Sequence, residues 1–154
     1  MHKISKKIIN WCISKNVSTI IIGSNKFWKQ NINIGKINNQ AFTQIPFYLL
    51  IKYIEDKALK SGIKIIKTEE SYISKASFLD LDNIPIYDEN KTNKYTFSGK
   101  RISRGMYKTS NDFCFNADLN GAGNILRKCS NKNINFNLAN LKSPEILNVK
   151  NIYK

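Results

Sequence analysis

Apolar residues recur at helical spacing in two segments of the chain, residues 3–16 and residues 46–61. In each segment they form one broad face, and lysines and other polar residues cover the rest. Pro46 suits the first helical position of the second segment, and Gly62 suits its end. The apolar faces are formed by Ile4, Ile8, Trp11 and Cys12 in the first segment and by Phe47, Leu50, Ile51, Ile54 and Ala58 in the second. These patterns predict two amphipathic helices, with Cys12 in the core.

Short runs of β-branched residues, 18–23 and 63–68, predict two strands. The first run ends in glycine and is typical of a strand buried on both faces. Because a predicted helix lies between the runs, the two strands are expected to be parallel and joined by a right-handed crossover. The fold class predicted is therefore α/β.

A third structured stretch is predicted at residues 113–129. Residues 113–115 form a short strand, and Ala122, Ile125 and Leu126 follow at helical spacing to about Lys128. Asp118 stands at the start of this helix. It is interpreted either as an N-cap without chemistry or as a metal-binding carboxylate at the edge of a sheet.

Two further regions lack clear periodicity. Residues 78–112 are read as a long insertion with a hairpin around Tyr95–Tyr107, and loops of this length are usually functional or mobile. Residues 130–154 are rich in asparagine and lysine and are expected to be a loosely ordered tail. The predicted organisation is a core at 1–77, the insertion at 78–112, the strand and helix at 113–129, and the tail at 130–154.

The charge balance of the chain gives the first indication of its function. Lys and Arg number 25 against 11 Asp and Glu, which gives a formal net charge of +14. A positive field of this size attracts polyanions. Nucleic acid is the leading candidate partner, and an anionic membrane surface is the alternative. We find no apolar run of ~18 residues and no signal-peptide pattern. A cytoplasmic protein is therefore expected, with no membrane partner.

The numbers of cysteine and histidine residues exclude several kinds of functional site. The chain has three cysteines, no C-x-x-C pair and a single histidine, His2. This argues against a disulfide framework, a zinc ribbon and histidine-based catalysis.

Two basic regions are candidates for binding nucleic acid. In residues 24–44, cations alternate with aromatic residues and could contact phosphates and stack on bases, although a solvated loop with Trp28 against the core is an equal alternative. The candidate residues are Lys26, Trp28, Lys29, Lys75, Lys100, Arg101 and Arg104.

Glu69 and Glu70 follow the second predicted strand directly. Ligand sites in sheets with helical crossovers gather at the carboxyl ends of the strands. Adjacent glutamates are more often part of a solvated turn, so the pair is a candidate site that position alone does not decide.

Several local motifs follow one another in an order that resembles a known family. They are residues 19–30 (TIIIGSNKFWKQ), 39–42 (NQAF) with 45–47 (IPF), 68–80 (TEESYISKASFLD), 97–102 (FSGKRI) with Arg104-Gly105, and 116–126 (NADLNGAGNIL). Over roughly residues 2–128 the chain resembles the C-terminal half of TnpB (OrfB), the transposon-encoded RNA-guided DNA nuclease related to type V CRISPR effectors.

The resemblance implies a partial RNase H-like (RuvC) fold that hydrolyses phosphodiesters with three carboxylates and two Mg²⁺ ions. Asp118 matches the third carboxylate. Gly23 stands where the family commonly has the second, and Glu69 or Glu70 is expected to replace it. The implied partners are DNA and, in the intact family, a guide RNA.

The chain also departs from the family. The first carboxylate and the guide-recognition domains belong to segments upstream of the matched stretch, and the zinc ribbon has no cysteines here, so no zinc is expected. We therefore expect a C-terminal fragment that partners the missing N-terminal half and does not cut DNA alone. Whether the chain is an enzyme stays open. The alternative is a non-catalytic remnant or a guide-dependent DNA binder.

Overall fold

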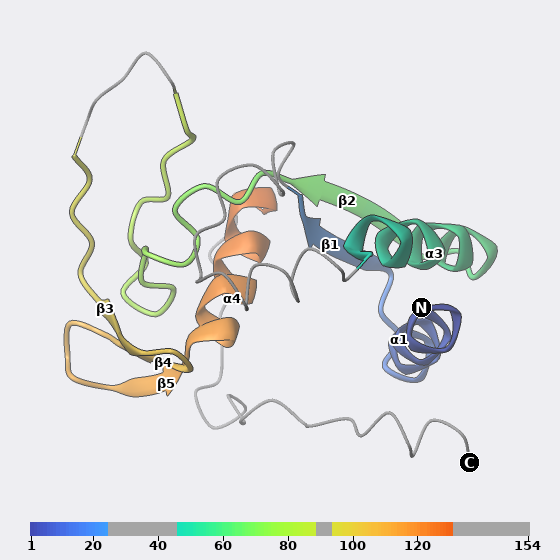
Figure 1. Ribbon diagram of the computed structural model, residues 1–154, viewed down its shortest axis with the longest axis horizontal. Coiled ribbons are helices and arrows are strands. Elements are labelled where there is room, and N and C mark those ends of the chain that lie inside the picture. The colour runs from blue at the N-terminus through green and yellow to red at the C-terminus, as the bar shows by residue number, and fades with distance from the viewer. Residues whose placement is uncertain (25–45, 89–93, 131–154) are drawn as a thin grey trace. The chain divides into compact units, whose positions relative to one another are not determined.

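The computed structural model describes residues 1–24, 46–88 and 94–130 (Figure 1). The chain divides into two compact units, Met1–Lys67 and Thr68–Lys154, and each is described by itself. The predicted tail at 130–154 lies, beyond Ser130, outside the described residues. Within the described ranges, no helix is long and apolar enough to cross a membrane.

The described residues of the first unit form two helices and a pair of strands. In chain order these are α1 (His2–Ser14), β1 (Thr19–Gly23), α3 (Phe47–Lys60) and β2 (Lys64–Thr68), the last ending at the boundary between the units. The four predicted elements are thus confirmed, with ends shifted by one or two residues. Gly62 has φ +69, the left-handed conformation that ends a helix at little cost to glycine. Pro46 is the N-cap of α3 and not its first helical residue.

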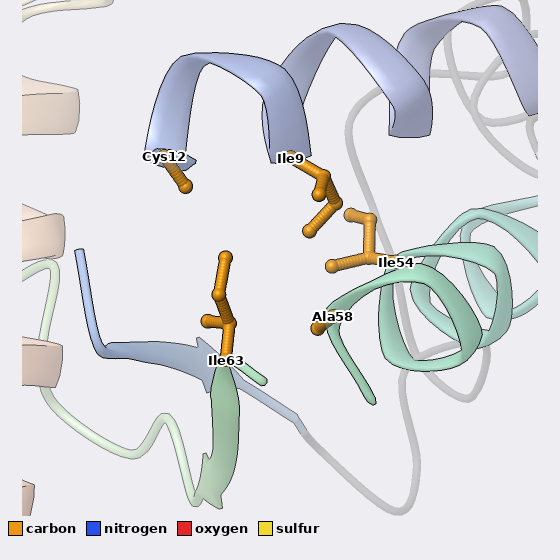
Figure 2. Close-up of a cluster of buried hydrophobic side chains, with 5 residues drawn as sticks. All are labelled: Ile9, Cys12, Ile54, Ala58 and Ile63. Atoms are coloured by element: carbon orange, nitrogen blue, oxygen red, sulfur yellow. The ribbon is translucent and has the colours of Figure 1, made fainter. Parts of the chain in front are cut away.

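The core of the first unit is an apolar cluster between the two helices and the strands. Figure 2 shows Ile9 and Cys12 of α1, Ile54 and Ala58 of α3, and Ile63 pointing toward one another. Partly buried residues extend this cluster, namely Ile8, Val17, Ile20, Ile22, Leu50 and Ile65. The prediction that Cys12 is a core residue is confirmed, and burial raises the pKa of its thiol.

The strands β1 and β2 pair with each other and run parallel, as the strand–helix–strand pattern predicted (Figure 1). The prediction that β1 is buried on both faces is wrong. The residues from Thr19 to Ile22 are only half-buried. Ile20 and Ile22, on one side of the strand, pack on the apolar cluster, whereas Ile21 is not part of it.

In the second unit, the described residues form a small antiparallel sheet followed by a helix. The strands are β3 (Lys100–Ser103), β4 (Met106–Lys108) and β5 (Cys114–Asn116), in the order β3-β4-β5, and the helix is α4 (Ala117–Cys129). The hairpin predicted within the insertion is the β3–β4 pair. The strand predicted at 113–115 is β5, which pairs with β4 so that Tyr107 faces Phe115.

Tyr107, Phe115 and Ala117 form the apolar core of the second unit, with Leu79 and Leu119 against them. Ala76, Ser77 and Phe78 are also buried, although no helix or strand contains them. The segment 78–112 therefore supplies core residues and has ordered strands. Its role as a family-specific insertion remains a prediction.

Candidate functional site

One face of α4 is polar and buried. Asn120 and Asn124, one turn apart, have no solvent exposure. Asn120 accepts a hydrogen bond from the Phe78 backbone N–H (2.9 Å) and donates to the Ala76 carbonyl (2.8 Å). Asn124 donates to the carbonyls of Ala76 (2.7 Å) and Ile73 (2.9 Å). The two amides thus satisfy backbone groups of a segment that has no regular structure of its own.

A glycine on the same helix allows this close approach. A Cβ at Gly123 would lie 2.6 Å from ring atoms of Phe78. No side chain fits there without displacing the ring, so the Phe78 ring lies directly against the helix backbone.

Glu69, the first residue after β2, is held by the C-terminal end of α4. Both of its carboxylate oxygens accept from Lys128 Nζ, at 2.7 and 2.8 Å, and one of them accepts from the Ser71 N–H at 2.8 Å. Lys128 Nζ also donates to the Ser71 carbonyl. Burial works to raise the pKa of Glu69, but the hydrogen bonds from Lys128 and Ser71 outweigh it and the pKa is lowered.

Arg127 adds a further contact from the same end of α4. Its Nη2 donates to the Asp82 carbonyl at 2.9 Å, and its Nη1 lies 3.4 Å from the Asn124 side-chain oxygen. Burial lowers the pKa of Arg127, and the nearby charge of Asp82 partly opposes this.

Two aspartates tie the same segment to residues that flank the sheet. Asp80 accepts from the hydroxyls of Ser77 (2.5 Å) and Ser110 (2.6 Å), and Asp82 accepts from the Ser77 N–H (2.7 Å) and from Ser98. Burial opposes ionisation of Asp80, but the hydrogen bonds from Ser110 and Ser77 lower its pKa overall. These carboxylates are fully engaged in holding the loops.

Tyr107 completes this framework from β4. Its ring is fully buried and its hydroxyl donates to the Lys75 carbonyl at 2.8 Å. Burial, with the nearby charge of Asp82, raises the pKa of Tyr107 to about 12. The phenol is therefore a neutral donor at physiological pH.

Asp118 lies exposed in the first turn of α4. The interpretation of Asp118 as the N-cap is wrong, because the cap is Asn116. The Asn116 side-chain oxygen accepts from the N–H groups of Asp118 (2.8 Å) and Leu119 (3.2 Å). Asp118 is left exposed at the positive end of the helix dipole, where a carboxylate is favoured.

Asp118 and the lysine that holds Glu69 lie near opposite ends of α4. Asp118 and Lys128, which holds Glu69, are ten residues apart, or about 15 Å along the helix axis. Glu70 is half-buried next to Glu69. Among the described residues, no group of three or more His, Cys, Asp or Glu side chains is placed to hold a metal ion. The described residues alone therefore do not form the three-carboxylate site that the resemblance implies.

The predicted cationic residues of the second unit are all exposed. Lys75 lies in the turn after Glu69, and Lys100, Arg101 and Arg104 lie on β3 and the turn that follows it. Lys26, Trp28 and Lys29 lie outside the described residues. Gly23 is buried at the end of β1, in the first unit.

Four polar residues that organise this region were not predicted from the sequence. These are Asn120, Asn124, Asp80 and Asp82. A signal was present for the asparagines, because their spacing of four residues puts them on one face of the predicted helix. Asparagine in a helix interior is unfavourable unless its amide is used, which makes such a pair informative.

Comparisons with known proteins find similarity in fold to a solved structure, described below. No family model matches the chain, and no curated protein does. The chain is similar in structure to a chain of the Cas12f1–sgRNA–target DNA complex solved by cryo-EM, with a TM-score of 0.54 and 22% sequence identity. The match covers 80% of this chain and 32% of the other, so the chain spans about a third of that protein's length. The fold is thus that of part of a Cas12f1 chain, which agrees with the predicted partial RNase H-like α/β fold.

Proposed function

We propose that this chain is the RuvC-like, C-terminal part of a transposon-associated RNA-guided DNA nuclease and that it binds nucleic acid. The observation that carries the proposal is the fold similarity to Cas12f1 over 80% of the chain, a protein solved with sgRNA and target DNA. The order of the TnpB-like motifs and the net charge of +14 support it.

In this proposal Asp118 is a metal ligand, and Glu69 or Glu70 takes the place of the carboxylate expected at Gly23. Asp118 is exposed and available. Glu69 would first have to leave Lys128, because a carboxylate that accepts two hydrogen bonds from an ammonium has few lone pairs left for Mg²⁺. A two-metal site would also need the aspartate that the resemblance places upstream. We therefore propose that the chain is inactive on its own.

The second candidate is a non-catalytic module that binds nucleic acid. Two observations favour it, namely glycine at position 23 and the ion pair between Glu69 and Lys128. A binder needs only cations, which contact phosphates without choosing a sequence.

Binding of labelled single-stranded DNA, duplex DNA and RNA at several salt concentrations tests the shared part of both candidates. We expect affinity for all three that falls steeply as salt rises. Failure to bind any of them at low salt would contradict both candidates.

Cleavage assays with Mg²⁺ test the proposed inactivity, which both candidates share. The proposal predicts no cutting of single-stranded DNA by the chain alone. If the chain cuts, Asp118→Ala should abolish cleavage, whereas Asp56→Ala, which removes an exposed aspartate of α3, should not. Cleavage that depends on Asp118 would overturn the proposed inactivity and establish the nuclease candidate.

A further inference from the structure

The segment 94–108 is positively charged and contains no acidic residue to balance that charge. It contains five cations and no acidic residue, and these cations are Lys94, Lys100, Arg101, Arg104 and Lys108. All four residues of β3 are exposed. This strand therefore contributes little to a core, and its side chains are directed largely at solvent.

The strand register places like charges against each other. Lys100 of β3 is the cross-strand partner of Lys108 of β4. Like charges directly opposite each other on two strands are destabilising. Asp112 binds Lys108 at 2.5 Å and offsets one of the two charges. A bound anion would relieve the rest.

The guanidinium of Arg101 is already fixed in position. Its Nε donates to the Ser103 carbonyl at 3.3 Å, and its Nη2 donates to the Arg104 carbonyl. These bonds use two of the five N–H donors of a guanidinium and leave the others for a partner. Because the group is held in place, it loses less side-chain entropy when it binds a phosphate.

An aromatic side chain lies at the start of the same segment. Tyr95 is 38% exposed, and its ring packs edge-on against Tyr72 with centroids 5.1 Å apart. Phe97 lies against the same Tyr72 ring at 6.2 Å. Tyr72 itself has φ +62, a conformation that non-glycine residues rarely adopt. The exposed Tyr95 ring is thus supported by neighbours and flanked by Lys94.

We propose that a single-stranded nucleic acid binds along residues 94–108, with its phosphates on Lys100, Arg101 and Arg104 and an unpaired base stacked on Tyr95. This inference rests on the proposed function and names the surface and the form of the ligand. Cations that line a backbone path, beside an exposed ring, are what binding of single strands requires. A base in a duplex is already stacked and cannot stack on Tyr95 in addition.

The charge part is tested with Lys100→Gln/Arg104→Gln, in a fluorescence anisotropy titration of single-stranded DNA over a range of salt. Loss of two phosphate contacts should lower the slope of log K against log salt by about 1.4. The matched control is Lys6→Gln/Lys7→Gln, which removes the same charge from exposed positions of α1 and should leave the slope almost unchanged.

The stacking part is tested with Tyr95→Ala and Tyr95→Phe. Tyr95→Ala should weaken binding of single-stranded DNA about fivefold or more, and Tyr95→Phe, which keeps the ring, should restore it. Duplex DNA should bind both variants like the wild-type chain. The control Tyr87→Ala removes another exposed tyrosine and should have no effect on either ligand.

The outcomes separate this inference from the proposed function. If the wild-type chain binds no nucleic acid, the proposed function fails. If it binds, but the 94–108 variants bind as tightly as the wild type, only this inference is wrong. Equal loss of duplex and single-strand binding in Tyr95→Ala would also overturn it, as would equally tight binding of polyglutamate, which would indicate an acidic protein as the partner.

Discussion

Each of the two units of this chain is stabilised internally by a different kind of contact. The first unit is built on an apolar cluster in which Ile54 and Ile63 meet side chains of α1. In the second unit, the apolar core is small, and the buried amides of Asn120 and Asn124 bind backbone groups of an irregular segment. In the second unit, buried hydrogen bonds thus add to a small apolar contact in fixing a helix in place.

The two arrangements respond differently to change. Apolar packing has no direction and tolerates substitutions that keep the volume. A buried amide has fixed donors and acceptors, so removing it leaves its backbone partners unsatisfied. The first unit should therefore be sensitive to volume and the second unit to hydrogen-bonding groups, which the following variants test.

The largest effect is expected in the first unit. Ile54→Ala removes a side chain that is 8% exposed and should lower the free energy of unfolding by about 2–5 kcal/mol. Hydrogen exchange with mass spectrometry should show faster exchange in α1 and α3. Leu59→Ala, on the same helix but 82% exposed, is the control and should change little. Equal effects would show that α3 does not pack as described.

Asn120→Ala should have the next largest effect, in the second unit. It deprives the Phe78 N–H of its acceptor and weakens the bonding of the Ala76 carbonyl, at a cost of about 2–4 kcal/mol. Exchange should accelerate at residues 73–82 while the first unit keeps its protection. Asn111→Ala, at an exposed asparagine, provides the matched control. If Asn120→Ala left the stability unchanged, the buried amide hydrogen bonds would not be what stabilises the second unit.

Two glycines of α4 give an internal contrast. Gly123→Ala would bring a Cβ to 2.6 Å from the Phe78 ring and should destabilise by about 1–3 kcal/mol. Nothing lies within 4 Å of a Cβ at Gly121, so Gly121→Ala should stabilise the helix by up to about 1 kcal/mol. Thermal unfolding of both variants measures the difference, and shifts of the same sign would contradict the close packing of Phe78.

The smallest expected effect is a response of the second unit to acid. The pKa values of Glu69 and Asp80 are lowered in the folded chain, so their stabilisation is present above the ordinary carboxyl pKa, near 4, and is lost as pH falls through the folded values. Both groups are partly exposed, so the loss is a fraction of a kcal/mol. Protection from exchange, taken relative to the intrinsic amide rate at each pH, should fall between pH 5 and pH 3 more at residues 69–82 than in α1 and α3. Glu69→Gln should reduce that difference.

The sequence predicted the first unit well because its contacts follow from apolar periodicity. Ile54 and Ala58 fall on one face of a helix at any reasonable choice of its ends. The second unit was harder to predict, because serine, aspartate and asparagine between residues 71 and 124 indicate loops when read locally. Several of their partners are 30 to 51 residues away, as with Ser110 and Asp80 or Asn124 and Ile73, and no local pattern reports such pairs.

The candidate site shows the same limit. The resemblance singled out Asp118 and the two glutamates, but it gave no sign that Lys128 holds Glu69. That ion pair joins residues 59 positions apart and depends on how α4 packs. The order of motifs thus indicates which residues are candidate metal ligands. Only the packing of the chain shows which of them already bind another side chain.

The distribution of free thiols makes the two units separately observable. Cys12 is buried in the first unit, Cys129 is half-buried at the end of α4, and Cys114 is exposed. A maleimide reagent should label Cys114 at once, and Cys12 only when the first unit opens, at a rate set by local unfolding. With Cys114 replaced by serine, the labelling time of the buried Cys12 would report the opening of the first unit, and the half-buried Cys129 would give a reference rate from the second unit.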